Sequence, residues 1–163
     1  MKSLQTLTAC ILLAITGCGG SPPPAEVGGP APHFKLTEVS TDKPVDSDSL
    51  KGNDVVVLNF WSTTCVSCLK EIEDLKQISA DGTAEVIGIV LGGSPEQVKK
   101  IVDTRGIEYP VLAGNEELFT QYDGYSLPYT LVLDANLTIR RKIFGRMDKE
   151  EFDQVIQSIK SET

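Results

Sequence analysis

The segment DVVVLNFWSTTCVSC, residues 54–68, decides the fold that we expect for this chain. Residues 54–61 form a continuous β-branched and aromatic run, which is typical of a strand buried on both faces of a parallel sheet. From residue 65 to residue 78, apolar side chains recur at intervals of three without Gly or Pro, which predicts a helix. A buried strand therefore leads through a short turn into a helix that begins with Cys65 and Cys68.

Segments of these two kinds alternate through the rest of the chain. Further strands are predicted at residues 84–91, 109–112, 129–133 and 137–144, and further helices at 94–105, at 116–122 and from 148 onward. The order β-α-β-α-β-α-β-β-α predicts an α/β fold in which helices flank a central mixed sheet. A length of 163 residues and a 40% hydrophobic composition fit one such domain, which we assign to residues 33–163.

The chain is acidic, with 15 basic and 23 acidic side chains and a formal net charge of −8. Proteins that bind phosphate backbones carry a strongly basic surface, and a chain this acidic, with no long block of Lys and Arg, lacks one. Nucleic acid is therefore excluded as a partner. Charge would not hold the folded part on an anionic membrane surface either.

The N-terminus has the features of a secretory signal peptide over residues 1–17. Its apolar run is shorter than the ~20 residues of a membrane-spanning helix and contains polar residues. The sequence ITGC at 15–18 resembles a bacterial lipobox, in which Cys18 is lipidated and becomes the first mature residue. The alternative is ordinary cleavage nearby, with Cys18 left as a free thiol. We expect a Gly- and Pro-rich tether, residues 18–32, to hold the domain at a membrane of the cell envelope, outside the cytoplasm.

The cysteines then leave one pair for chemistry. Of the four, Cys10 is removed with the signal and Cys18 carries lipid, so Cys65 and Cys68 remain. A disulfide across two intervening residues closes too small a loop to stabilise much, so a redox role is favoured over a structural one. The start of a helix lowers the pKa of the first sulfur, which makes Cys65 the nucleophile and Cys68 the resolving, more buried partner. A zinc site would need four ligands, and His33 near the tether is the only other soft or imidazole ligand.

The sequence FWSTTCVSC, residues 60–68, resembles the active-site segment of thioredoxin-like proteins. The sequences APHFKL at 31–36 and LNFW at 58–61 are closer to the membrane-anchored TlpA/ResA branch. The sequence SLPYT at 126–130 matches the place where that fold carries a cis-proline, here Pro128, opposite the cysteines. The resemblance covers about residues 31–160 and implies a thioredoxin fold with no cofactor beyond the Cys65–Cys68 disulfide. The chain departs from the pattern at Thr64, where a Trp is common, and at Asn59, where cytosolic thioredoxins keep a buried Asp.

Glu71 is the candidate to replace that Asp. At 100° per residue it falls within the apolar arc of the helix and one turn from Cys68. A carboxylate placed there should have a raised pKa and could take the proton of Cys68 during exchange. The resemblance agrees, because the TlpA/ResA branch carries a functional Glu three residues after the second Cys. The alternative is a Glu side chain that reaches water.

The resemblance implies a thiol–disulfide oxidoreductase that reduces protein disulfides. It suggests apocytochrome c or copper-site cysteines as targets and a membrane reductase as electron donor. The backbone of Leu127 would pair with an extended substrate, and Trp61 would either contact the substrate or pack beneath the site. Two alternatives stay open. The first is a peroxidase of the same fold, although the Pro that its nucleophile loop needs is missing between residues 53 and 65. The second is a Cu(I) chaperone that uses the two cysteines.

Overall fold

The computed structural model describes residues 25–162, so the predicted signal peptide and Cys18 lie outside the described residues. The strands are β1 (Lys35–Thr37), β2 (Pro44–Asp46), β3 (Val55–Trp61), β4 (Glu85–Leu91), β5 (Val111–Gly114), β6 (Tyr129–Asp134) and β7 (Ile139–Phe144). The helices are η1 (Ser47–Leu50), α1 (Val66–Ala80), α2 (Pro95–Arg105), α3 (Glu116–Gln121) and α4 (Lys149–Ser161). Within residues 25–162, no helix is both long enough and apolar enough to cross a bilayer.

Five strands form one mixed sheet in the order β5-β4-β3-β6-β7. The strands β3, β4 and β5 are parallel, and β6 runs antiparallel to both of its neighbours, which confirms the predicted mixed sheet. Every residue of β3 is buried, because this strand lies at the centre and has helices on both sides. The sequence pattern does not predict β1, β2 and η1, since segments of three or four residues are too short to show a periodicity.

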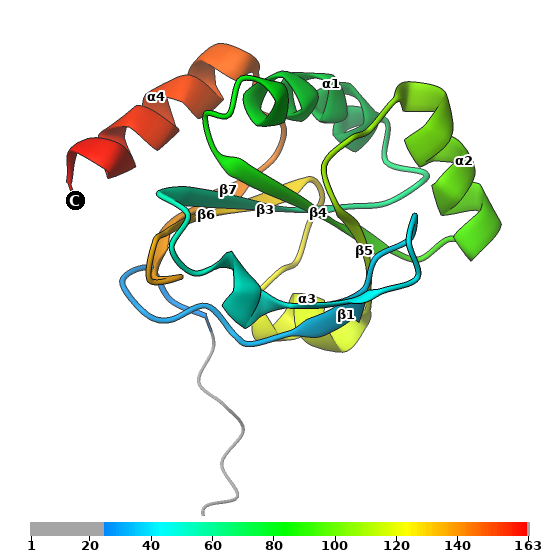
Figure 1. The fold of residues 1–163 in the computed structure, drawn as a ribbon, viewed down its shortest axis with the longest axis horizontal. Helices are drawn as coiled ribbons and strands as arrows, with labels where there is room; N and C mark the ends of the chain where they lie inside the picture. Colours follow the sequence, from blue (N-terminus) through cyan, green and yellow to red (C-terminus); the bar gives the residue numbers. More distant parts are fainter. Residues whose placement is uncertain (1–24, 163) are drawn as a thin grey trace, which may run out of the picture.

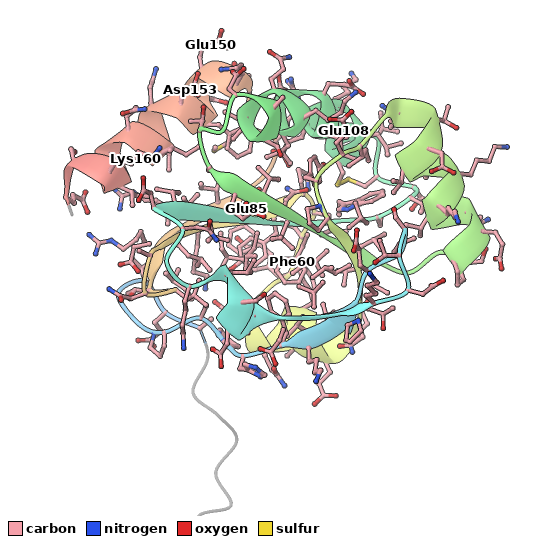
Figure 2. All side chains as sticks on the ribbon, viewed as in Figure 1. Phe60, Glu85, Glu108, Glu150, Asp153 and Lys160 are labelled. Atoms are coloured by element: carbon pink, nitrogen blue, oxygen red, sulfur yellow. A yellow bond between two sulfur atoms is a disulfide. The ribbon has the colours of Figure 1, made fainter. Side chains whose placement is uncertain are left out.

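The side chains of β3 alternate between two cores. Val55, Val57 and Trp61 belong to the core that also contains residues of α1, α2 and α4. Val56, Leu58 and Phe60 belong to the core beneath α3 and the N-terminal segment. Figure 1 shows α1 and α4 on one face of the sheet and α3 on the other, and Figure 2 shows Phe60 in the interior between the layers.

The prediction of a tether over residues 18–32 is wrong for residues 25–32, which pack on the folded domain. Ala25 is only 3% exposed, and residues 28–31 run antiparallel to residues 137–139, where β7 begins. The Gly28 N–H donates to the carbonyl of Ile139 at 2.7 Å, and the Ala31 N–H donates to the carbonyl of Leu137 at 2.9 Å. A Gly- and Pro-rich segment lacks a side-chain pattern, but its backbone can still cover the open edge of a sheet. The folded domain therefore includes residues 25–32.

Replacing Gly124 by Ala should destabilise the fold by about 1–3 kcal/mol, because a Cβ there would overpack the core. This atom would lie 2.2 Å from Cε2 of Phe119. The Phe119 ring cannot easily move, since it packs against Phe60 with 5.5 Å between ring centroids. Urea unfolding would measure the loss. In the double variant Gly124→Ala/Phe119→Leu, the two losses should be less than additive; full additivity would contradict the steric explanation.

Candidate active site

The two cysteines lie where β3 ends and α1 begins. A turn at residues 62–64 connects the two elements, and the Cys65 N–H donates to the Ser62 carbonyl at 3.2 Å. Cys65 is the N-cap of α1, in extended backbone conformation, and Cys68 lies in the first turn of the helix. The two sulfur atoms are joined in a disulfide, with 5.2 Å between the Cα atoms. The structure therefore represents the oxidised form of the pair.

The two sulfur atoms differ in their access to solvent. Cys65 is partly exposed, whereas Cys68 is fully buried. The Cys68 N–H donates to Cys65 Sγ at 3.2 Å, and the Ser67 hydroxyl lies 3.4 Å from the same sulfur. These polar groups at a helix N-terminus would stabilise a negative charge on Cys65 after reduction. The burial difference fits the predicted order, with Cys65 as the sulfur that meets a substrate.

Glu71 is fully buried one turn beyond Cys68, as its place in the apolar arc predicted. Its Oε1 accepts a hydrogen bond from the Met147 N–H at 2.8 Å, and its Oε2 accepts one from Asn59 Nδ2 at 2.7 Å. Burial raises the pKa of Glu71 to about 7, against the opposing effect of these hydrogen bonds and of the Arg146 charge. A carboxyl group with this pKa can exchange a proton near neutral pH.

A surface groove runs beside Cys65. Its lining comes from the turn before α1, the end of β4, α3 and the loop before β6, namely Ser62, Thr63, Thr64, Cys65, Leu91, Gly92, Gly93, Glu116, Phe119, Tyr125, Ser126 and Leu127. The Leu127–Pro128 peptide bond is cis, as the resemblance implied. Pro128 is buried and Leu127 is half-buried. The N–H and C=O of Leu127 form no hydrogen bond within residues 25–162, so they can pair with another chain.

Comparison with known proteins identifies the family. The sequence model of the AhpC/TSA family matches residues 27–142. The thiol-disulfide oxidoreductase ResA of Geobacillus kaustophilus is 30% identical over 82% of this chain and 78% of its own length. The thioredoxin-like protein YneN of Bacillus subtilis is 29% identical over 78% of this chain and 76% of its own length. The chain belongs to the ResA-type thiol–disulfide oxidoreductases of the AhpC/TSA family.

A solved structure supports the same assignment. The thiol:disulfide interchange protein of Chlorobium tepidum TLS, a thioredoxin family protein, has 29% sequence identity and a TM-score of 0.72. The superposition covers 86% of this chain and 99% of that one. The predicted thioredoxin fold is thereby confirmed, and this ResA-type chain is a protein-disulfide oxidoreductase whose CxxC pair is Cys65 and Cys68.

The structure gives Asn59 a part that sequence reasoning missed. Its Nδ2 donates both to Glu71 Oε2 and, at 2.9 Å, to Thr130 Oγ1, while its Oδ1 has no partner within residues 25–162. Rotation of the amide by half a turn would present Oδ1 to a protonated Glu71. Asn59 can therefore serve either protonation state of the carboxyl group. The pairing of β3 with β6 would have revealed this role, because its register places Asn59 opposite Thr130.

Trp61 packs in the core beneath the site of this oxidoreductase. The side chain is fully buried in the core shared with Cys68, which favours packing beneath the site over substrate contact, the two roles that the sequence left open. The exposed aromatic residue of the groove is instead Tyr125, which is 74% exposed. Its ring stacks on Phe144 at 4.0 Å between centroids, and Phe144 stacks on Tyr129 at 4.3 Å. Sequence periodicity could not find Tyr125, because it lies in a loop.

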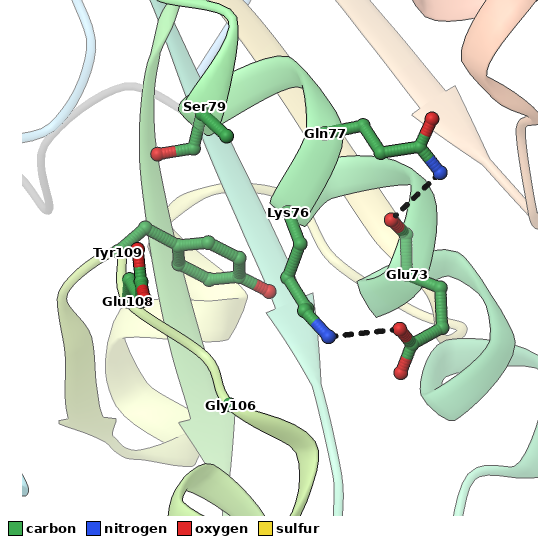
Figure 3. A pocket seen from close by; sticks show the side chains of 8 residues that line it. Glu73, Lys76, Gln77, Ser79, Gly106, Glu108 and Tyr109 are labelled. Atoms are coloured by element: carbon green, nitrogen blue, oxygen red, sulfur yellow. Dashed lines mark hydrogen bonds and ion pairs between the residues drawn. The ribbon is translucent and has the colours of Figure 1, made fainter.

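Two other features lie outside the groove. His33 is exposed, and its Nε2 lies 2.9 Å from Asp46 Oδ1. Another cavity, of about 580 Å³, lies beside the C-terminal half of α1. There Lys76 Nζ donates to Glu73 Oε2 at 2.9 Å (Figure 3). Neither cysteine lines this cavity.

Proposed function

We propose that this chain is a lipid-anchored oxidoreductase that reduces disulfides of other proteins outside the cytoplasm. The observation that carries the proposal is the contrast between a partly exposed Cys65 and a fully buried Cys68. A substrate sulfur can reach the first and not the second. In support of the location, the sequence ITGC at residues 15–18 resembles a lipobox, with Cys18 as the lipidated residue.

The reaction starts from the dithiol form. The Cys65 thiolate attacks one sulfur of the substrate disulfide, forms a mixed disulfide and displaces the other substrate sulfur as a thiolate. Cys68 then attacks Cys65 Sγ, which releases the second substrate sulfur and leaves the Cys65–Cys68 disulfide. Two electrons pass to the substrate. The proton that Cys68 must lose passes to Glu71, whose pKa of about 7 suits this transfer.

The groove supplies the binding site for the substrate backbone. The unpaired N–H and C=O of Leu127 would form hydrogen bonds with an extended segment of the substrate. Pro128 has no N–H, so the chain beside the cysteines offers no competing donor at that position. The binding is largely through the backbone, which suits an enzyme that acts on more than one protein.

The family likeness supports a proposal for the substrates and the electron donor. We propose unfolded or partly folded proteins with a cysteine pair as substrates, with apocytochrome c and copper-site proteins as candidates, and a membrane thiol reductase as donor. Only six residues lie between Cys18 and Ala25, so the domain would stay within about 25 Å of the lipid. Such a short link would keep it close to a membrane-bound donor.

Trapping with the Cys68→Ser variant tests the proposal. Because resolution is blocked, Cys65 should remain in mixed disulfides that appear as higher-mass bands on non-reducing gels and disappear with dithiothreitol. Cys65→Ser/Cys68→Ser should trap nothing. Purified wild-type protein should also reduce insulin disulfides with dithiothreitol as electron source. Rapid turnover of hydrogen peroxide, or tight Cu(I) retention without insulin reduction, would instead support the peroxidase or the copper chaperone.

A further inference from the structure

The groove at Cys65 continues into a second, smaller pocket. Gly92 and Gly93, between β4 and α2, line both. Both are exposed and have positive φ angles of 73° and 89°. Because neither glycine has a side chain, an open passage connects the groove with the second pocket. A Cβ on Gly93 would lie 3.0 Å from Thr63 Cγ2, in the turn that leads to Cys65, so the passage begins close to the reactive sulfur.

The second pocket is small and mainly apolar. Its volume is about 220 Å³, and its walls come from β1 and the loop after it, the ends of β4 and β5, and the first turns of α2, namely Thr37, Val39, Asp42, Val90, Gly92, Gly93, Pro95, Val98, Ala113 and Gly114. Val90 and Val98 belong to the core beneath α1, which fixes the floor of the pocket. Asp42 is its only ionisable lining residue and is exposed. The pocket therefore suits an uncharged, apolar group and disfavours an acidic one.

We propose that this pocket receives an apolar side chain of the substrate polypeptide, a few residues from its reacting cysteine. The inference rests on the proposed exchange with protein disulfides. A substrate segment that pairs with Leu127 must cross the groove at Cys65, and the groove opens into the pocket at Gly92 and Gly93. The substrate backbone would bind at Leu127, and the pocket would in addition select substrates by one of their side chains.

The negative charge of the neighbourhood strengthens this selection. Glu116 lines the groove and Asp42 lines the pocket, and no Lys or Arg lines either hollow. Substrates with an acidic residue near the cysteine should therefore be repelled, and those with an apolar residue should be preferred.

Synthetic peptides with one cysteine, activated as mixed disulfides with 5-thio-2-nitrobenzoate, test the pocket. Attack of reduced Cys65 on the peptide sulfur forms a Cys65–peptide disulfide and releases the coloured thiolate; Cys68 then displaces the peptide thiol. The second-order rate constant is measured for peptides that carry Leu, Ser or Asp at each position within four residues of the cysteine. At one position, Leu should be favoured over Ser by about tenfold, and Asp should be the slowest.

Filling the pocket should abolish this preference. Ala113 is exposed on β5 and Thr37 is exposed on β1, so Ala113→Leu and Thr37→Leu fill the pocket from two sides without disturbing buried residues. Ala80→Leu is the matched control, because Ala80 is also exposed but lines the separate cavity at the end of α1. This control should keep the wild-type preference for Leu.

The outcomes separate the pocket from the function itself. The mixed disulfide of 2-mercaptoethanol with 5-thio-2-nitrobenzoate is too small to reach the pocket, and all variants should react with it at the wild-type rate. Wild-type protein that reacts equally with Leu, Ser and Asp peptides would overturn the pocket proposal and leave the oxidoreductase intact. Failure of wild-type protein to react with any peptide would overturn the proposed function as well.

Discussion

As the pH rises from about 4 to about 8, the free energy of unfolding of the Glu71→Gln variant should increase by about 3 kcal/mol relative to that of the wild type. Burial raises the pKa of Glu71 from its ordinary 4.5 to about 7. Between these values the folded protein holds a proton that the unfolded chain has lost. The stability of the wild type therefore falls as pH rises through this window and levels off above about pH 7. Gln does not titrate, so it removes this fall.

Urea unfolding of both proteins at a series of pH values would measure the difference between them. A constant cost of placing Gln at this site cancels, because only the change with pH is compared. The matched control is Glu73→Gln on the same helix. Glu73 is exposed, and its hydrogen bond with Lys76 lowers its pKa. That variant should show no gain with rising pH. Parallel stability curves for Glu71→Gln and wild type would show that the buried carboxyl group does not titrate in this range.

The same variant reports on proton transfer from Cys68. With Cys65 held in a mixed disulfide, the release of the bound thiol measures attack by Cys68 at each pH. In wild type the rate should show an inflection near pH 7, where Glu71 becomes able to accept the proton. Glu71→Gln should lose this inflection and keep only the rise that belongs to the thiol itself. An unchanged profile would remove Glu71 from the mechanism.

Glu71 also shows how far the sequence could lead. Its burial followed from the angular position of one residue on a helix, because helical periodicity fixes which side chains face the sheet. Its hydrogen-bond partners did not follow, since Asn59 and Met147 come from β3 and from the loop before α4. Contacts between distant segments depend on strand register and loop path, which local patterns do not contain.

The same limit explains the other differences. The central strand β3 and the helix α1 were predictable because burial produces a long and regular pattern in each. Residues 25–32 pack through backbone hydrogen bonds, which leave no trace in the choice of side chains. The groove at Cys65 combines four separate segments, and its passage depends on the missing side chains of Gly92 and Gly93. Its lining residues outside the two motif segments, residues 60–68 and 126–130, could not be found from the sequence: Leu91, Gly92, Gly93, Glu116, Phe119 and Tyr125.

Trp61→Ala should lower the unfolding free energy by about 3–5 kcal/mol, which is a large part of the stability of a domain of this size. Trp61 is fully buried at the end of β3, in the core that contains Cys68. Gly88 on β4 makes room for the indole, since a Cβ there would lie 3.2 Å from Trp61 Nε1. Trp61 is the only tryptophan of the chain, so unfolding must be followed by circular dichroism rather than by fluorescence.

Trp61→Phe separates packing from substrate contact. Within residues 25–162, the Trp61 Nε1 has no hydrogen-bond partner, so Phe loses volume but no hydrogen bond. Its cost should be smaller, about 1–2 kcal/mol. The rate of exchange with peptide disulfides, measured per folded molecule, should equal that of wild type, because a fully buried ring cannot touch the peptide. A variant that is as stable as wild type but exchanges slowly with peptides, and normally with small disulfides, would restore Trp61 to the substrate-binding surface.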